Sequence, residues 1–190
     1  MANKWLDGFD KYAVYADLTT FSYAPPAASP TFSTTSGRFG GGGVSTISSA
    51  GSGVIRPDTF ALELWVGYAI KVTDTNNNDR SIFTVVSPGS SNSGLEGTLT
   101  YNPVLGIFKA WRGPVNTLLG SVTNLLTTGT WNWIDVHYKY SATVGIFEVW
   151  LNGTQILNVT AANTANNSGQ TSLSAVHLGC GLGKASVPSP

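Results

Sequence analysis

Apolar side chains occupy every second position of the chain from residue 60 to residue 72. A period of two places alternate side chains on opposite faces of a β-strand. The pattern therefore predicts one long strand with a core face and a more polar outward face. The core set is Phe60, Leu62, Leu64, Val66, Tyr68, Ile70 and Val72, and the outward set is Ala61, Glu63, Trp65, Gly67, Ala69 and Lys71.

The polar residues 74–79 predict a turn, and residues 81–87 predict a second strand that pairs with the first as a hairpin. No stretch of a dozen residues carries an apolar stripe of period 3.6, so almost no helix is expected. Many short strands separated by Pro, Gly and Asn predict an all-β antiparallel sandwich. The other strands are predicted at residues 95–101, 106–112, 117–122, 131–140, 145–152, 155–159 and 173–180.

The chain of 190 residues has the length of one domain. We expect that domain at residues 1–183, with a Pro-rich loop or arm at 23–36 and a flexible tail at 184–190. Charged residues make up only 11% of the chain, ten basic and ten acidic, which argues against a nucleic acid or an anionic membrane as partner. The single cysteine, Cys180, excludes an internal disulfide. Residues 1–10 do not resemble an export signal, so we expect synthesis in a cytoplasm.

Residues 131–140 (WNWIDVHYKY) and 145–153 (GIFEVWLNG) resemble the hairpin of laminin-G-like domains, in which a tryptophan opens one strand and a glycine-ended turn closes the next. Residues 5–10 (WLDGFD) and 37–41 (GRFGG) resemble the opening of short laminin-G-like proteins found among bacteriophage virion components. The resemblance implies a jelly roll of the concanavalin A-like superfamily, which agrees with the predicted strands.

The short turn between the two strands of this hairpin predicts their register. Pairing Tyr140 with Gly145 makes one face core and the other polar. Trp131 opens the first strand and is expected to lie in the core. The facing pairs are predicted to be Val136 with Val149, Tyr138 with Phe147, and His137 with Glu148.

The resemblance implies a non-enzymatic structural protein of a bacteriophage virion, assembled in the host cytoplasm. We expect a capsid decoration or cement protein whose partners are other virion proteins, above all the major capsid protein. One alternative is a tail-associated lectin-like module that binds glycans on the host surface. An endoglycanase is a more distant alternative.

Laminin-G-like virion proteins commonly end with an acidic and aromatic strand that returns beside the N-terminal strand. This chain ends soon after residues 176–181, so we expect that closing strand to be absent or replaced. Because natural proteins rarely leave a sheet edge unpaired, a homo-oligomer or a permanent contact with another virion protein is expected, and a trimer would suit a capsid. The alternative is that the arm at 23–36 or the tail after Lys184 covers the edge.

Relatives that cleave β-glucans carry a Glu-x-Asp-x-x-Glu row on one strand. On the strand that contains Glu63, the sequence has Trp65 and Gly67 where further acids would be needed. The nearest substitute is Asp135 with Glu148, which the predicted register makes diagonal neighbours, but exposed strand faces ordinarily carry such residues. We therefore predict that the protein is not an enzyme and has no catalytic residue.

Trp65, Trp133 and Trp150 fall on the outward faces of their strands. Exposed indoles can stack on sugar rings or anchor a protein interface, and the alternative is that a second layer covers them. His137 and Glu148 are predicted to form a surface pair on the same side. These five residues are the candidate glycan-binding or protein-binding site.

The remaining motifs predict neither a metal nor a cofactor. The spacing Asp74-x-Asn76-x-Asn78 is that of a calcium loop, but Asp79 stands where such a loop requires glycine. The glycines of residues 179–184 fit no phosphate-binding fingerprint. No arrangement of the two histidines with a serine or the cysteine predicts a nucleophile.

Overall fold

The computed structural model describes part of the chain in full and part as backbone only. None of the described residues is helical, and no helix that could cross a membrane is found among them. The backbone alone is described for residues 3–7, 31–33, 43–45 and 54–58, and backbone with side chains for residues 59–73, 77–88, 94–114 and 116–178.

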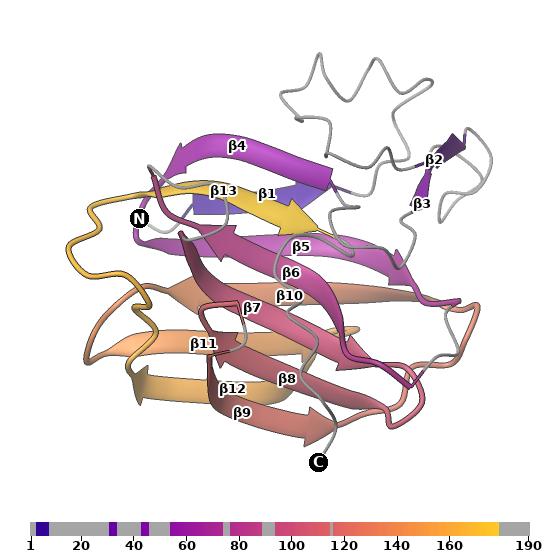
Figure 1. Cartoon of the computed structure of the whole chain (residues 1–190). Coiled ribbons are helices and arrows are strands. Elements are labelled where there is room, and N and C mark those ends of the chain that lie inside the picture. Colours follow the sequence, from indigo (N-terminus) through magenta and orange to yellow (C-terminus); the bar gives the residue numbers. More distant parts are fainter. Residues whose placement is uncertain are drawn as a thin grey trace.

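Two β-sheets lie face to face (Figure 1), so the predicted all-β sandwich is confirmed. Hydrogen-bonded neighbours are antiparallel, except that β1 runs parallel to β5. The five-stranded sheet has the order β1 (Asn3–Asp7), β5 (Glu63–Lys71), β10 (Trp131–Lys139), β11 (Gly145–Leu151) and β12 (Thr154–Ala162). The six-stranded sheet has the order β4 (Val54–Phe60), β13 (Leu173–Leu178), β6 (Arg80–Val86), β7 (Leu95–Asn102), β8 (Ile107–Arg112) and β9 (Thr117–Thr123). A separate pair consists of β2 (Thr31–Ser33) and β3 (Gly43–Ser45).

The core lies between the two larger sheets and uses the side chains that the alternation assigned to it. Leu64, Val66 and Tyr68 of β5 are each at most 3% exposed. Across the sandwich, Phe147 packs edge-on against Phe83, at 6.2 Å between ring centroids. Burying one such side chain stabilises the fold by about 1.5–3 kcal/mol, which makes this layer the main stabilising feature of the sandwich.

The predicted register of the β10–β11 hairpin is confirmed. His137 pairs with Glu148, and Val136 with Val149, as expected from a turn that joins Tyr140 to Gly145. The short connection fixes this register because it leaves no slack between the paired ends.

The predicted long strand at residues 60–72 is wrong in one respect. The chain leaves one sheet at Phe60, the end of β4, and enters the other at Glu63, the start of β5. The predicted hairpin with residues 81–87 is therefore also wrong, because β6 pairs with β7 and β13, not with β5. The alternation continues through this corner because Phe60 and Leu64 reach the same core from opposite sheets.

The last described strand does not border an open edge. β13 lies between β4 and β6 and pairs with both, so its backbone groups have partners on either side. Residues 173–178 therefore do not form a sheet edge. Among the described strands, β1 ends the five-stranded sheet and pairs only with β5, and the missing closing strand was expected beside this N-terminal strand. The arm at 23–36, apart from β2, lies outside the described residues, as do Cys180 and the tail at 184–190.

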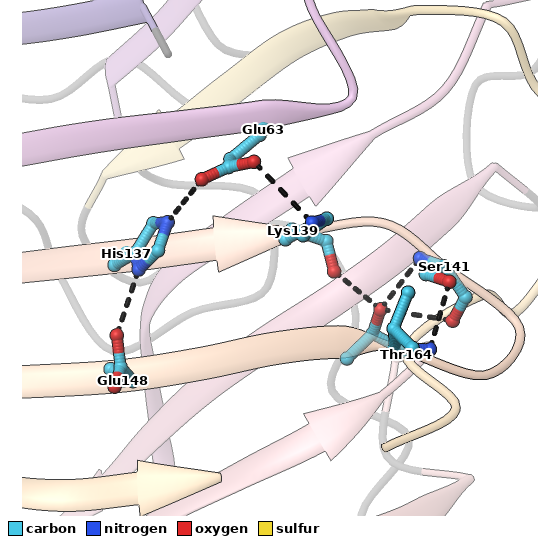
Figure 2. A network of polar contacts seen from close by, with 7 residues as sticks. Glu63, His137, Lys139, Ser141, Glu148 and Thr164 are labelled. Carbon is cyan, nitrogen blue, oxygen red and sulfur yellow. Dashed lines mark hydrogen bonds and ion pairs between the residues drawn. The ribbon is translucent and has the colours of Figure 1, made fainter. Parts of the chain in front are cut away.

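The connection from β12 to β13, residues 163–172, crosses from one sheet to the other and is held by buried polar groups. The carboxylate of Glu96 is fully buried and accepts hydrogen bonds from the backbone N–H groups of Asn166 (2.9 Å) and Asn167 (3.0 Å). The hydroxyl of Thr164 donates to the carbonyl of Lys139 at 2.6 Å (Figure 2). These contacts tie the crossing to the ends of β7 and β10.

Candidate functional site

The outward side of the five-stranded sheet gathers the candidate residues of the sequence analysis. Alternation along β5, β10 and β11 points their core residues inward and leaves the other set on this side. The register then sets Trp65 opposite His137, and His137 opposite Glu148. We call this surface the tryptophan face and define it by Glu63, Trp65, Lys71, Trp131, Trp133, Asp135, His137, Lys139, Glu148 and Trp150.

His137 lies between two carboxylates (Figure 2). Its Nδ1 is 2.8 Å from Glu148 Oε2, and its Nε2 is 3.0 Å from Glu63 Oε1. A carboxylate only accepts hydrogen bonds, so both contacts are satisfied together when both ring nitrogens carry protons. The sequence predicted the contact with Glu148 but not the one with Glu63. The His137 side chain is 8% exposed, so the predicted surface pair is instead a triad around a buried imidazole.

Further polar groups hold the outer edges of this triad. Lys139 Nζ lies 3.7 Å from Glu63 Oε2, and Gln155 of β12 donates to Glu148 Oε1 at 3.2 Å. Both oxygens of each carboxylate therefore have partners. The register confirms that Asp135 and Glu148 are diagonal neighbours, with Asp135 opposite Trp150 and Glu148 opposite His137.

The aromatic part of the face packs directly on the triad. The rings of Trp65 and His137 are stacked, with 4.2 Å between centroids and 7° between planes. Trp150 packs against the other indole at 4.9 Å with a tilt of 35°. Trp65 and Trp150 are both partly exposed, so their mutual packing leaves ring surface open to a ligand.

Trp131 and Trp133 extend the face along β10. Both are half-buried and outward, so the prediction that Trp131 lies in the core is wrong. The reason is parity, because strand β10 begins at Trp131 and residues two apart share a face. Lys71 Nζ lies 5.2 Å from the centre of the Trp131 ring, within the range of a cation–π contact.

Asp135 is the carboxylate of this face that has no partner among the residues that the structure describes. It is half-buried, and its neighbours across the sheet are Gly67 on β5 and Trp150 on β11. A half-buried carboxylate without a donor is available to accept hydrogen bonds from a ligand. The sequence pattern indicated Asp135 only as a member of an acid pair with Glu148, because a single sequence does not show which carboxylates lack a partner.

The outward side of the six-stranded sheet carries a second histidine. His177 is 5% exposed, and its Nδ1 has no hydrogen-bond partner among the described residues. Burial lowers the pKa of His177 to about 4, so the ring is neutral at pH 7. In the register it faces Thr84, which is also buried. No described group completes a nucleophile or a metal site there, and in the described part of the chain no cluster of His, Cys, Asp and Glu could hold a metal.

The calcium-like spacing at residues 74–79 falls partly outside the described residues. Asp79, which is described, receives hydrogen bonds from Lys109 Nζ at 2.9 Å and from Asn102 Nδ2 at 3.1 Å. Its carboxylate thus serves to hold the start of β6 to β7 and β8.

No protein-family model and no curated protein sequence matches this chain. Solved structures do share its fold. A sialidase matches with a TM-score of 0.59 at 17% identity, over 97% of this chain and 15% of that one. An endo-β-1,4-glucuronan lyase from the fungus Trichoderma reesei matches with a TM-score of 0.51 at 11% identity, over 81% and 77% of the two chains. An alginate lyase matches with a TM-score of 0.50 at 16% identity, over 67% of this chain and 63% of its own.

These similarities support the β-sandwich fold. At such identities they bear on the fold alone. The prediction that the protein is not an enzyme is contradicted at this level, because two of the proteins that share the fold are polysaccharide lyases. That prediction rested on the absence of one hydrolase pattern, and a fold shared with lyases makes this absence insufficient. None of these three neighbours is described as a phage protein.

Proposed function

We propose that the tryptophan face binds a carbohydrate. The observation that carries the proposal is the stack of Trp65 on His137, with Trp150 packed against the same indole. The apolar faces of sugar rings match such indole surfaces, and their hydroxyl groups match carboxylate acceptors such as Asp135.

The rigidity of this surface supports the proposal. All its side chains project from regular strands, and the two hydrogen bonds of His137 hold the ring on which Trp65 rests. A binding surface that is ordered before the ligand arrives loses little conformational entropy on binding. A fold that is shared with two polysaccharide lyases and a sialidase agrees with this proposal without testing it.

The experiment is a binding screen against immobilised plant, microbial and algal polysaccharides, followed by calorimetry on the polymers that bind. Trp65→Ala and Trp150→Ala should abolish or strongly weaken binding. Trp111→Ala is the matched control, because this indole lies on β8 of the other sheet and bonds Thr100. Equal loss in all three variants, or no binding to any polymer by the unmodified protein, would contradict the proposal. The same panel should be assayed for cleavage products, since the fold also occurs in lyases.

A position in a phage virion, with the major capsid protein as partner, is a second proposal. An apolar group at one end of the sandwich favours a protein partner. Val104, Leu105 and Leu125 are 49%, 50% and 67% exposed. The turn and the connection that carry them touch, because a Cβ added to Gly106 would lie 3.0 Å from the backbone of Leu125. Exposed apolar patches commonly mark interaction sites.

The test compares the unmodified protein with the double variant Leu105→Ser, Leu125→Ser by light scattering and by binding to purified phage capsids. We expect the unmodified protein to form an oligomer or a complex with capsids, and we expect the double variant to form neither. A monomer without affinity for capsids in both proteins would contradict it.

A further inference from the structure

The outward residues of β10 form a straight row across the tryptophan face. Trp131, Trp133, Asp135 and His137 alternate with buried residues, so all four point to the same side. Same-face neighbours on a strand are about 7 Å apart, which makes the row about 20 Å long. Trp65 stacks on His137 at one end of the row, and Lys71 lies over Trp131 at the other. The row is therefore several times longer than a single sugar ring.

The outward residues of the neighbouring strand β5 are smallest beside the middle of this row. Gly67 lies opposite Asp135, and Ala69 lies opposite Trp133. These are the two smallest outward residues of β5, and the larger Trp65 and Lys71 flank them. Gly67 is buried, whereas Ala69, Trp133 and Asp135 are partly exposed, so an extended ligand can lie along the strands over Ala69 and against the ring of Trp133.

The charge in the middle of the row selects the ligand. Glu63 and Glu148 are held by His137, whereas Asp135 has no donor among the described residues. A free carboxylate accepts hydrogen bonds from hydroxyl groups and repels another carboxylate at short range. This part of the face suits a sugar chain that is rich in hydroxyl groups and free of uronate charge.

We infer that the tryptophan face binds the interior of a linear, uncharged polysaccharide. The chain lies along β10 from Trp131 to Trp65, and its hydroxyl groups donate to Asp135. This inference rests on the proposed carbohydrate-binding function and adds the class and the direction of the ligand. Alginate and glucuronan, the polymers in the names of two fold neighbours, are polyuronates, so this face would reject both.

The test uses oligosaccharides of increasing length from cellulose, xylan and laminarin, with alginate and polyglucuronate oligomers as charged counterparts, and calorimetry as the readout. Affinity for one neutral series should rise with chain length until the row is covered. Trp131→Ala should weaken the long oligomers and leave the shortest ones unchanged. Asp135→Ala should weaken neutral oligomers about tenfold or more, the effect of losing hydrogen bonds to a charged group. Asp135→Asn should raise the affinity for uronate oligomers, and Trp111→Ala should change neither series.

Two results would overturn the inference while the proposed function stands. One is an affinity that does not change with oligomer length, which would indicate a terminal sugar. The other is tighter binding of uronate oligomers than of neutral ones by the unmodified protein. Absence of binding to every polysaccharide and oligosaccharide would remove the proposed function itself.

Discussion

The imidazole ring of His137 lies parallel to the indole of Trp65, with 4.2 Å between the ring centroids and 7° between the planes. Hydrogen bonds to an imidazole lie in the plane of its ring, so the carboxylates of Glu63 and Glu148 fix the tilt of that plane from two sides. The indole of Trp65 stacks on this ring and is therefore held parallel to it. His137 is thus a positioning residue for Trp65.

Replacement of His137 tests this relationship. His137→Phe keeps an aromatic ring under Trp65 but removes both ring nitrogens that contact the carboxylates, and the half-buried Glu148 loses a partner. We expect the free energy of unfolding to fall by about 1–3 kcal/mol. His137→Ala also removes the stack, so it should weaken carbohydrate binding more than His137→Phe does. Urea denaturation and calorimetry measure the two effects.

Lys139→Ala is the control for this pair of variants. Its ammonium is 3.7 Å from Glu63, and both side chains are more than a third exposed. Such a surface ion pair contributes about 0–1 kcal/mol, so the variant should be nearly as stable as the unmodified protein. If Lys139→Ala were as destabilising as His137→Phe, the triad would have no special role in holding the face.

Gly97 of β7 lies against the ring of Tyr138, and its substitution should show how tightly the core is packed. A Cβ added there would lie 2.5 Å from Cε2 of Tyr138. That ring is fully buried, and its hydroxyl donates to the carbonyl of Thr164 at 2.8 Å, so it has no room to move. Gly97→Ala should therefore reduce the free energy of unfolding by about 1–3 kcal/mol, the usual effect of overpacking.

A double-mutant cycle with Tyr138→Leu checks the cause of this effect. The smaller side chain leaves space for the added methyl group, so Gly97→Ala should destabilise the Tyr138→Leu background much less than the unmodified protein. Strictly additive effects would show that the destabilisation arises elsewhere, for example from the backbone of β7.

The crossing at residues 163–172 should depend on the charge of Glu96. In Glu96→Gln one carboxylate oxygen becomes an NH₂ group, which cannot accept from the N–H donors of Asn166 and Asn167. A buried donor without an acceptor destabilises by about 1–3 kcal/mol. Glu63→Gln makes the same chemical change at a side chain that is 37% exposed and should have a smaller effect. Equal melting temperatures of the two variants would contradict this role of Glu96.

The sequence predicted most strands and the register of one hairpin, because both depend on local patterns. Alternation shows which side chains of β5 face the core, and a short turn sets Val136 opposite Val149. The corner between Phe60 and Glu63 was not predictable in this way, because both sheets share one core and the alternation passes through it unchanged. β12 is longer than predicted and includes Ala161, whose φ of 52° is unusual in a strand.

The site was predictable only where it is local. The facing of His137 and Glu148 follows from a turn of a few residues. The contact of His137 with Glu63 joins positions 74 residues apart in the sequence, and it requires the pairing of β5 with β10. The same pairing places Gly67, which has no side chain that could donate, beside the carboxylate of Asp135. No pattern in one sequence specifies the pairing of two distant strands, so these features required the structure.

His177 should make the stability of the protein depend on pH. Burial lowers its pKa in the folded protein to about 4, whereas an unfolded histidine titrates near 6.5. Between these values the unfolded chain binds the proton more strongly, so the free energy of unfolding falls as the pH falls from 6.5 towards 4. Above pH 6.5 both states are neutral and this contribution is constant. The shift sets an upper limit of about 3 kcal/mol on the loss.

His177→Phe isolates this contribution. The phenyl ring does not titrate, and it also replaces a buried Nδ1 that has no hydrogen-bond partner, so at pH 8 the variant should be as stable as the unmodified protein or more stable. The difference between the two free energies of unfolding, measured by urea denaturation at a series of pH values, cancels the titration of all groups that both proteins share. It should grow in favour of His177→Phe as the pH falls below about 6.5. A difference that stays constant down to about pH 4.5 would show that His177 is not held neutral in the folded protein.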